Sequence, residues 1–295
     1  MKFARIGQAG HERAVVISED GVYDLAGDDI DANFWTSGGV ERVSRAMREG
    51  RLSRVEGWEN QRIGAPIARP GAVICVGMNY AAHAAESGSE PPENPIVFLK
   101  TPNTVVGPHD DVPLPPGSTT TDWEVELGVV IGAPALYVTS PQAAAAHVAG
   151  YVVVNDVSER TFQMDHSGGQ WSKGKCAPCF TPTGPWLVTP EHCDSTDLTL
   201  RSWVNGEPRQ NSTTADMIFS VNTLVWHLSQ YMELEPGDLL LTGTPQGVAL
   251  SGRFPYLAVG DIVETEIAGL GRQRQRITRT DVSGLSATTA NRKGE

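Results

Sequence analysis

From residue 72 onward the chain is a series of short apolar stretches separated by loops rich in proline and glycine, and this pattern constrains the fold most. Apolar stretches at 72–80 and 150–156 alternate with polar, proline-containing loops such as 87–95 and 107–118. Short apolar segments bounded by turn residues are typical of β-strands. We therefore expect a mostly β protein with some α-helix.

The first 65 residues are predicted to form a small α+β domain. Three short strands precede one amphipathic helix at 38–50, in which Val40, Val43 and Met47 recur at helical spacing. Two prolines and two glycines within 63–71 are typical of a domain boundary. The predicted units are an N-terminal domain at 1–65, a larger domain at 70–283 and a flexible tail at 284–295.

Two helices are predicted within the larger domain. One starts at Ser140, a preferred N-cap residue, and continues with Pro141 at the first helical position. The other, at 220–232, carries an apolar face. Its apolar residues are Val221, Leu224, Val225 and Leu228.

Charge and composition exclude several classes of partner. The formal net charge of −12 repels nucleic acid and anionic membranes, and the chain has no block of Lys and Arg to reverse this. No apolar run approaches the roughly 20 residues of a membrane helix, and the N-terminus lacks the apolar core of a signal peptide. We expect a cytoplasmic protein that binds neither nucleic acid nor membrane.

Four cysteines occur at irregular spacing, which does not suit a disulfide framework in a chain of this size. Cys176 and Cys179, with His192 and Cys193, form the only arrangement that suggests zinc. Adjacent ligands fit a tetrahedral site badly, so ordinary, partly buried thiols are the favoured interpretation.

Glu124 and Glu126 lie in the middle of the stretch at 121–130, which otherwise resembles a buried strand. Alternate residues of a strand face the same side, so the two carboxylates share one patch. In the simpler interpretation they face water, as we expect for Glu264 and Glu266, which show the same spacing. In the other they are buried, and a cation is needed to neutralise them.

Asp156 favours the second interpretation because it ends the apolar strand at 150–156. A third carboxylate beside Glu124 and Glu126 completes an oxygen-only site, which suits Mg²⁺ or Mn²⁺ better than zinc. The alternative for Asp156 is an acid that caps a loop.

His83 and Glu86 lie three residues apart in a short predicted helix that Asn79 can cap. A carboxylate that orients an imidazole makes histidine a general base. The alternative is a surface ion pair.

Polar groups suited to ligand binding occur at two further places. Lys175 follows Arg160 and Gln163 closely in the sequence, and Thr244 lies in a glycine-rich turn whose amides can bind a ligand carboxylate. The turn is not a nucleotide-binding P-loop, because the pattern G-x-x-x-x-G-K-[ST] is absent. It can equally be a tight connection.

Eight segments, in this order, resemble the fumarylacetoacetate hydrolase family over about residues 70–275. They read GMNYAAHAAES, IVFLKTPN, DWEVELGVVIG, GYVVVNDVSER, QWSKGK, FTPTGPWLVT, QNSTTADMIFSV and LEPGDLLLTGTPQGV. Among its members the chain looks most similar to bacterial ones with a small N-terminal domain, which include 2,4-diketo-3-deoxy-sugar-acid hydrolases and acylpyruvases. The resemblance implies a mixed β-sandwich roll and a homodimer.

The resemblance also implies roles for individual residues. Glu124, Glu126 and Asp156 match the ligands of a divalent ion, and His83 and Glu86 match a dyad that activates water. Lys175 matches a catalytic lysine, whereas Gln163, Thr244, Lys100 and Arg160 are assigned to substrate binding. The chain departs from the family pattern at Met78 and at 176–179, which leaves the identity of the substrate open.

These observations predict a Mg²⁺- or Mn²⁺-dependent hydrolase that cleaves a carbon–carbon bond in 2,4-dioxo acids of the acylpyruvate type. The loop at 87–95 is interpreted as a lid over the ligand. One alternative is a decarboxylase or an enol/keto isomerase that acts on a 2-oxo diacid. Another is a non-catalytic ligand-binding module.

Overall fold

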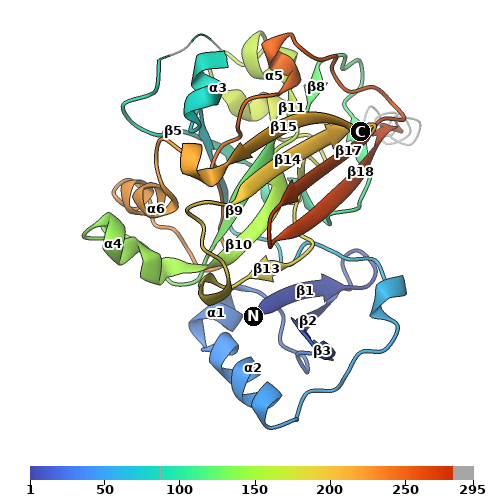
Figure 1. Ribbon diagram of the computed structural model, residues 1–295, viewed down its shortest axis with the longest axis vertical. Coiled ribbons are helices and arrows are strands. Elements are labelled where there is room, and N and C mark those ends of the chain that lie inside the picture. Colours follow the sequence, from blue (N-terminus) through green and yellow to red (C-terminus); the bar gives the residue numbers. More distant parts are fainter. Residues whose placement is uncertain (87, 89, 282–295) are drawn as a thin grey trace, which may run out of the picture.

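A nine-stranded sheet and a five-stranded sheet form the centre of the molecule (Figure 1). The computed structural model describes residues 1–86, 88 and 90–281, so the predicted tail at 284–295 lies outside the described residues. The larger sheet has the order β3 (Gly21–Asp24), β2 (Arg13–Ser18), β1 (Lys2–Ile6), β13 (Leu187–Val188), β10 (Val148–Asn155), β9 (Val125–Ile131), β16 (Leu239–Leu241), β4 (Val73–Gly77) and β5 (Ile96–Lys100).

The smaller sheet packs against strands β9 and β10 of the larger one. Its order is β15 (Glu207–Thr213), β14 (Thr199–Val204), β17 (Ile262–Ile267), β18 (Gly271–Arg279) and β7 (Val112–Leu114). Two short pairs complete the strands: β11 (Ser158–Glu159) with β8 (Thr121–Asp122), and β12 (Thr181–Pro182) with β6 (Val105–Val106). The prediction of a mostly β protein is confirmed.

Short helices cover the sheets and their ends. They are α1 (Ala32–Thr36), α2 (Gly39–Arg48), α3 (Ala81–Glu86), α4 (Pro141–Ala144), α5 (Arg160–Met164) and α6 (Val221–Ser229). Ser140 caps α4 as predicted, since its side chain accepts a hydrogen bond from the amide of Ala143. Every described helix is too short or too polar to cross a bilayer.

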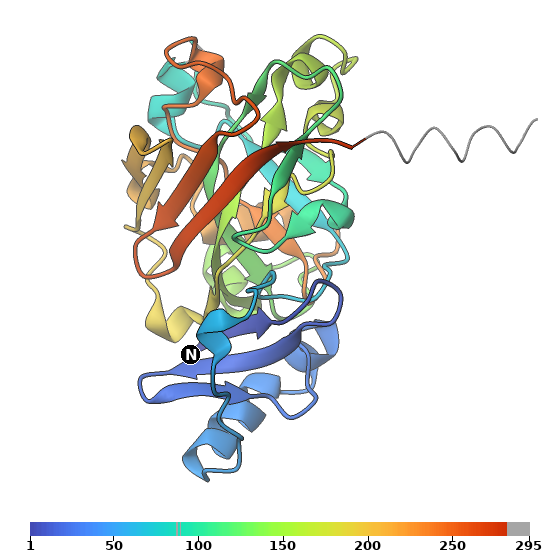
Figure 2. The same ribbon diagram turned by 90° about the vertical axis from the view of Figure 1, so that its right-hand side faces the viewer.

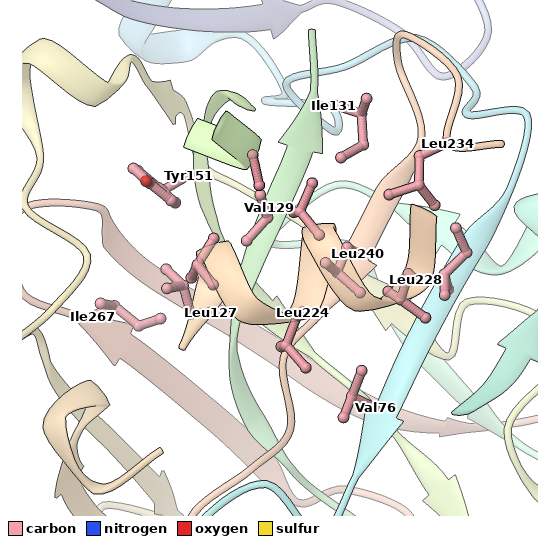
Figure 3. Close-up of a cluster of buried hydrophobic side chains, with 14 of the residues drawn as sticks. Val76, Leu127, Val129, Ile131, Tyr151, Leu224, Leu228, Leu234, Leu240 and Ile267 are labelled. Atoms are coloured by element: carbon pink, nitrogen blue, oxygen red, sulfur yellow. The ribbon is translucent and has the colours of Figure 1, made fainter. Parts of the chain in front are cut away.

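Helix α6 closes the main core over the larger sheet. Its predicted apolar face is buried, and Leu224 and Leu228 belong to the same cluster of buried side chains as Leu127, Val129 and Leu240 on β9 and β16 (Figure 3). Burying a side chain of this size stabilises a fold by roughly 1.5–3 kcal/mol. This packing fixes β9, the strand that carries Glu126.

The N-terminal strands continue the larger sheet, because β1 pairs antiparallel with β13 through Lys2 and Val188. The predicted helix at 38–50 is α2, and its Val43 is buried against these strands. This part of the chain lies at one end of the molecule, and α3 and α5 lie at the other (Figure 1; Figure 2). The division of the chain at residues 65–70 stays a prediction.

Candidate active site

Three carboxylates meet where β9 begins and β10 ends. Antiparallel pairing of these strands places Val154 opposite Glu126, and the amide of Asp156 donates to the carbonyl of Glu124 at 2.9 Å. One carboxylate oxygen from each of Glu124, Glu126 and Asp156 lies within 4.8 Å of the other two. All three side chains are buried, so Glu124 and Glu126 do not face water.

The second pair with the same spacing behaves differently. Glu264 and Glu266 lie on β17, are partly exposed, and flank the guanidinium of Arg272 at 3.1 and 3.6 Å. They are surface acids, as expected. The spacing is therefore shared by a surface pair and a buried pair, and burial separates the two.

Lysine and arginine side chains neutralise part of the buried acid cluster. The ammonium Nζ of Lys175 lies 2.7 Å from Oε2 of Glu124 and 2.8 Å from Oδ2 of Asp156. The guanidinium of Arg160 lies 2.7 Å from Glu124 and also 2.7 Å from Asp122. Lys100 donates to Asp156 and, at 2.7 Å, to the carbonyl of Phe180.

Glu124 and Glu126 respond to these charges in opposite ways. Burial raises the pKa of Glu124, but Lys175 and Arg160 outweigh it and lower this pKa to about 2. Burial, together with Asp156 and Glu124, raises the pKa of Glu126 well above its usual value. Among the described side chains, none with a positive charge forms an ion pair with Glu126, which accepts its hydrogen bond from the amide of Gly243 at 2.7 Å.

The cluster therefore contains one more carboxylate than it has cations. Asp122, Glu124, Glu126 and Asp156 face the side chains of Lys100, Arg160 and Lys175. A buried carboxylate without a counter-ion is costly, and a bound cation removes that cost. Oxygen donors from Glu124, Glu126 and Asp156 fit a hard divalent ion such as Mg²⁺ or Mn²⁺.

A glycine turn holds Glu126 in place. Gly243 has a φ of +95°, and a Cβ at this position would lie 2.9 Å from the Cβ of Asn79. Only glycine adopts this backbone conformation at such close approach without strain. The sequence therefore supplies the amide that orients Glu126.

The predicted capping role of Asn79 is wrong. Its side chain donates to the carbonyls of Phe219 and Thr242 at 3.1 and 2.8 Å, and thus ties the start of α3 to two distant segments. Asp216 satisfies the helix instead, since its Oδ2 accepts from the amide of Ala82 at 3.1 Å. A residue 134 positions away in sequence supplies the cap, which local pattern reasoning does not detect.

His83 and Glu86 lie side by side on α3, as their spacing predicts. Nδ1 of His83 is 3.9 Å from Oε2 of Glu86, which is longer than a hydrogen bond. Burial lowers the pKa of His83, so the imidazole is held neutral. A neutral, buried imidazole is the form that accepts a proton.

A cavity of about 610 Å³ connects the dyad with the acid cluster. The predicted residues that line it are His83, Glu86, Glu124, Glu126, Arg160, Gln163, Lys175 and Thr244. Asp156 and Lys100 lie outside this lining, fully or almost fully buried. Of the predicted lid at 87–95, positions 87 and 89 lie outside the described residues, while Glu90 and Pro92 line the cavity.

Gln163 and Thr244, which are predicted to bind substrate, form hydrogen bonds with other groups of the protein. Oε1 of Gln163 accepts a hydrogen bond from Arg160 at 2.9 Å. The hydroxyl of Thr244 donates to the carbonyl of Val125 at 2.9 Å and accepts from Gln210 at 2.7 Å. Their roles in substrate binding stay predictions.

Sequence reasoning missed Asp122, which holds Arg160 and also accepts from the amides of Ala249 and Leu250. The alternation that links Glu124 and Glu126 extends back to Asp122, so the pattern could have found it. It also missed Arg253, whose guanidinium lies 3.0 Å from Oε1 of Glu86. No sequence pattern links these two positions.

The thiols lie outside the acid cluster. All four cysteines are free, Cys75 is buried and the other three are partly buried. Burial raises the pKa of Cys193 to about 11. Within the described part of the chain, Glu124, Glu126 and Asp156 form the only group of three or more potential metal ligands.

Comparison with known proteins identifies the family. The profile described as "Fumarylacetoacetate (FAA) hydrolase C-terminal" matches residues 72–278. The chain belongs to the fumarylacetoacetate hydrolase family. It is 44% identical to a 2,4-didehydro-3-deoxy-L-rhamnonate hydrolase from Sphingomonas sp. (strain SKA58), over 94% of this chain and 96% of that protein.

Solved structures of this family share the whole fold. A 5-carboxymethyl-2-hydroxymuconate delta-isomerase from Mycobacterium smegmatis has a TM-score of 0.76 and 33% identity, over 95% of this chain and 100% of that chain. Maleylpyruvate hydrolase from Sphingobium sp. SYK-6, solved with manganese(II) and pyruvate, has a TM-score of 0.77 and 25% identity over the same shares. The resemblance and the family-type fold predicted from sequence are confirmed.

Proposed function

We propose that this protein is a divalent-metal-dependent hydrolase that cleaves the C3–C4 bond of a 2,4-dioxo acid of the acylpyruvate type. The observation that carries the proposal is the position of His83 on the same cavity as Glu124 and Glu126, of which Glu126 is buried without a cationic partner. A general base and a cation site that share one cavity suit attack of water on a substrate held as a chelate.

Glu124, Glu126 and Asp156 would hold the ion, either Mg²⁺ or Mn²⁺. When bound there, a divalent ion supplies Lewis-acid polarisation of the 2-oxo acid group and charge stabilisation for the leaving enolate. The relative from Sphingobium sp. SYK-6, which contains manganese(II) and pyruvate, supports both the metal and the type of product.

The chain's own residues would perform the proton transfers. His83 accepts a proton from water, whose oxygen adds to C4 and breaks the carbonyl π-bond. Collapse of this adduct breaks the C3–C4 bond, forms a carboxylic acid from the acyl group, and leaves the electron pair on the pyruvate enolate. The proton that His83 took from water then goes to C3 and converts the enolate to pyruvate, so that one water is consumed in total and His83 is neutral again.

Lys175, with Arg160 and Gln163 beside it, would place positive charge and hydrogen-bond donors near the developing oxyanion. The cavity is partly apolar and its cations are preorganised by Asp122, Glu124 and Asp156, which strengthens such stabilisation. Burial keeps His83 neutral and therefore ready to accept the proton. Each group thus acts from the position in which the fold already holds it.

The similarity to a 2,4-didehydro-3-deoxy-L-rhamnonate hydrolase supports a 2,4-dioxo acid as the substrate. One second reaction also has support. The M. smegmatis relative is a delta-isomerase, which supports proton transfer without water attack on this fold. Decarboxylation of a 2-oxo diacid needs the same enolate stabilisation.

Product analysis distinguishes these reactions. Acylpyruvates, oxaloacetate and an unsaturated 2-hydroxy diacid are incubated with the protein and Mn²⁺, and the products are followed by NMR. Formation of pyruvate and one carboxylic acid in equal amounts supports hydrolysis. Intact acylpyruvates, with release of CO₂ or migration of a double bond in the diacids, would replace hydrolysis with the second reaction.

A homodimer, a cytoplasmic location and a separate N-terminal domain at 1–65 are further parts of the proposal. The resemblance to the family supports the dimer. Light scattering coupled to size-exclusion chromatography tests it, because a mass of twice 31.7 kDa is expected.

A further inference from the structure

The cavity wall combines two chemically different sets of side chains. The first set is polar and contains Glu124 and Glu126 of the acid cluster together with His83 and Glu86. The second set is apolar, and its side chains come from several elements. It consists of Val76, Met78, Pro92, Ile96, Phe98, Met164, Trp171, Val248 and Leu250.

The apolar wall is tightly built. Trp171 packs on Phe98 with ring centroids 5.6 Å apart, and it lies directly over Gly77. A Cβ at Gly77 would lie 2.3 Å from the Trp171 ring, so only glycine leaves room for the indole. The wall continues to partly open positions, where Met164 and Leu250 are 53% and 39% exposed.

The positively charged side chains around the cavity form ion pairs with carboxylates of the protein. The two lining cations, Arg160 and Lys175, form ion pairs with Asp122, Glu124 and Asp156. Arg253 is nearby, and its guanidinium pairs with Glu86.

A further acidic residue, Glu90, also lines the cavity. Within the described lining, Arg160 and Lys175 are the only lysine or arginine side chains, so a second carboxylate on a substrate meets no unpaired cation there.

We propose that the cavity selects 2,4-dioxo acids whose acyl arm beyond C4 is uncharged and largely apolar, and that it disfavours dicarboxylates. Met164 and Leu250 are the specificity-determining residues at the partly exposed part of this wall. An apolar arm buries surface against them, whereas a carboxylate loses water without gaining a partner and is repelled by Glu90. This inference rests on the proposed function, because it concerns the arm of the same substrate.

A matched pair of substrates tests the inference. In 2,4-dioxoheptanedioate the arm ends in a carboxylate, and in 7-methyl-2,4-dioxooctanoate an isopropyl group of the same number of heavy atoms replaces it. We expect kcat/KM to be at least tenfold higher for the isopropyl compound. Added salt should narrow the difference, because it screens repulsion between like charges.

Equal rates, or a preference for the dicarboxylate, would overturn the inference and leave the hydrolase intact. Failure of the protein to cleave either compound, with metal present and the fold intact, would instead contradict the proposed function. The two failures are therefore distinguishable.

Substitution of Met164 tests the assignment of the arm. Met164→Arg places a cation at the wall and should raise kcat/KM for the dicarboxylate about tenfold, while Met164→Gln is the neutral control. Equal kcat/KM values for the two variants with the dicarboxylate would overturn the role of Met164. If Met164→Arg does not fold, Leu250→Arg with Leu250→Gln as its control makes the same comparison at the other open position.

Discussion

Nδ1 of His83 lies 3.9 Å from Oε2 of Glu86, so the two members of the predicted dyad are neighbours without a hydrogen bond. Glu86 is held by other groups. Its Oε2 accepts from the amide of Gly247 at 2.9 Å, and Arg253 donates to its Oε1 at 3.0 Å. The carboxylate is thus fixed by a distant loop, and in this arrangement it influences His83 through its charge.

Replacing His83 tests the assignment of the general base. We expect His83→Asn to lower kcat by about 10²- to 10⁴-fold, the usual contribution of a general base, and to leave Mn²⁺ affinity unchanged. Glu86→Gln should cost less, because Glu86 orients the base and does not take the proton. Stopped assays of pyruvate and calorimetric titration of Mn²⁺ measure the two effects. A His83→Asn variant with full activity would remove His83 from the mechanism.

The pH dependence of activity follows from the lowered pKa of His83. Burial disfavours the imidazolium, so His83 stays neutral and competent as a base below the usual value of 6.5. We expect the acid limb of kcat/KM to have its midpoint below pH 6.5. A midpoint above pH 7 would contradict a buried, neutral His83.

The same shift affects stability. In the unfolded chain His83 has its ordinary pKa and binds a proton at higher pH than in the folded chain. Stability should therefore fall as the pH drops from 6.5 toward the folded-state pKa. His83→Asn should flatten this dependence, and denaturant unfolding at several pH values between 5 and 7 measures it. If the pH dependence of stability is the same in His83→Asn as in the wild type, other groups and not His83 cause the loss of stability.

Substitution of Glu126 should raise the stability of the metal-free protein and remove the stabilisation that a bound metal ion provides. Glu126→Gln removes a buried carboxyl group whose pKa is raised by burial and by Asp156, so it should stabilise the metal-free protein at neutral pH, above the ordinary pKa of a glutamate. It should also abolish the rise in Tm that Mn²⁺ produces in the wild type. Glu264→Gln, in the surface pair of the same spacing, should change neither quantity. Thermal unfolding with Mn²⁺ and with chelator compares the variants, and a normal response of Glu126→Gln to Mn²⁺ would exclude Glu126 as a ligand.

Lys175 is expected to matter for both folding and activity. Lys175→Met leaves Glu124 and Asp156 without their shared ammonium, and breaking such a buried pair costs about 3–5 kcal/mol. Lys173→Met is a matched control, because Lys173 is exposed and donates to the carbonyl of His166. Denaturant unfolding and kcat should respond to the first substitution alone. Equal stability of the two variants would contradict the neutralising role of Lys175.

The sequence contained most of the local information about this fold. The apolar face of α6 and the N-cap of α4 were predicted from residues within one or two turns, and both are present. The carboxylates of β9 and β10 were also predictable, because strand alternation and strand ends are local features. Their burial was not decided by spacing, since Glu264 and Glu266 share the pattern and lie at the surface.

The features that could not be predicted from the sequence are contacts between residues far apart in the chain. Asp216 caps α3, Arg253 binds Glu86 and Gly243 holds Glu126, and each pair is more than 100 positions apart. Such contacts depend on how the sheets bring loops together, and the periodic pattern of apolar residues in a helix or strand does not predict them. The ligand cavity has the same property, because its wall is formed by strands, helices and loops between Val76 and Ser251.

Metal-dependent hydrolysis is tested most directly by cleavage of an acylpyruvate by purified protein with Mn²⁺, and again after the metal has been removed with chelator. The absorbance of the enol-diketone is followed, and pyruvate is quantified as product. We expect loss of absorbance with one pyruvate per substrate, inactivity in chelator, and recovery when Mn²⁺ or Mg²⁺ is restored. Undiminished cleavage in chelator, or no cleavage of any acylpyruvate by metal-loaded protein, would contradict it.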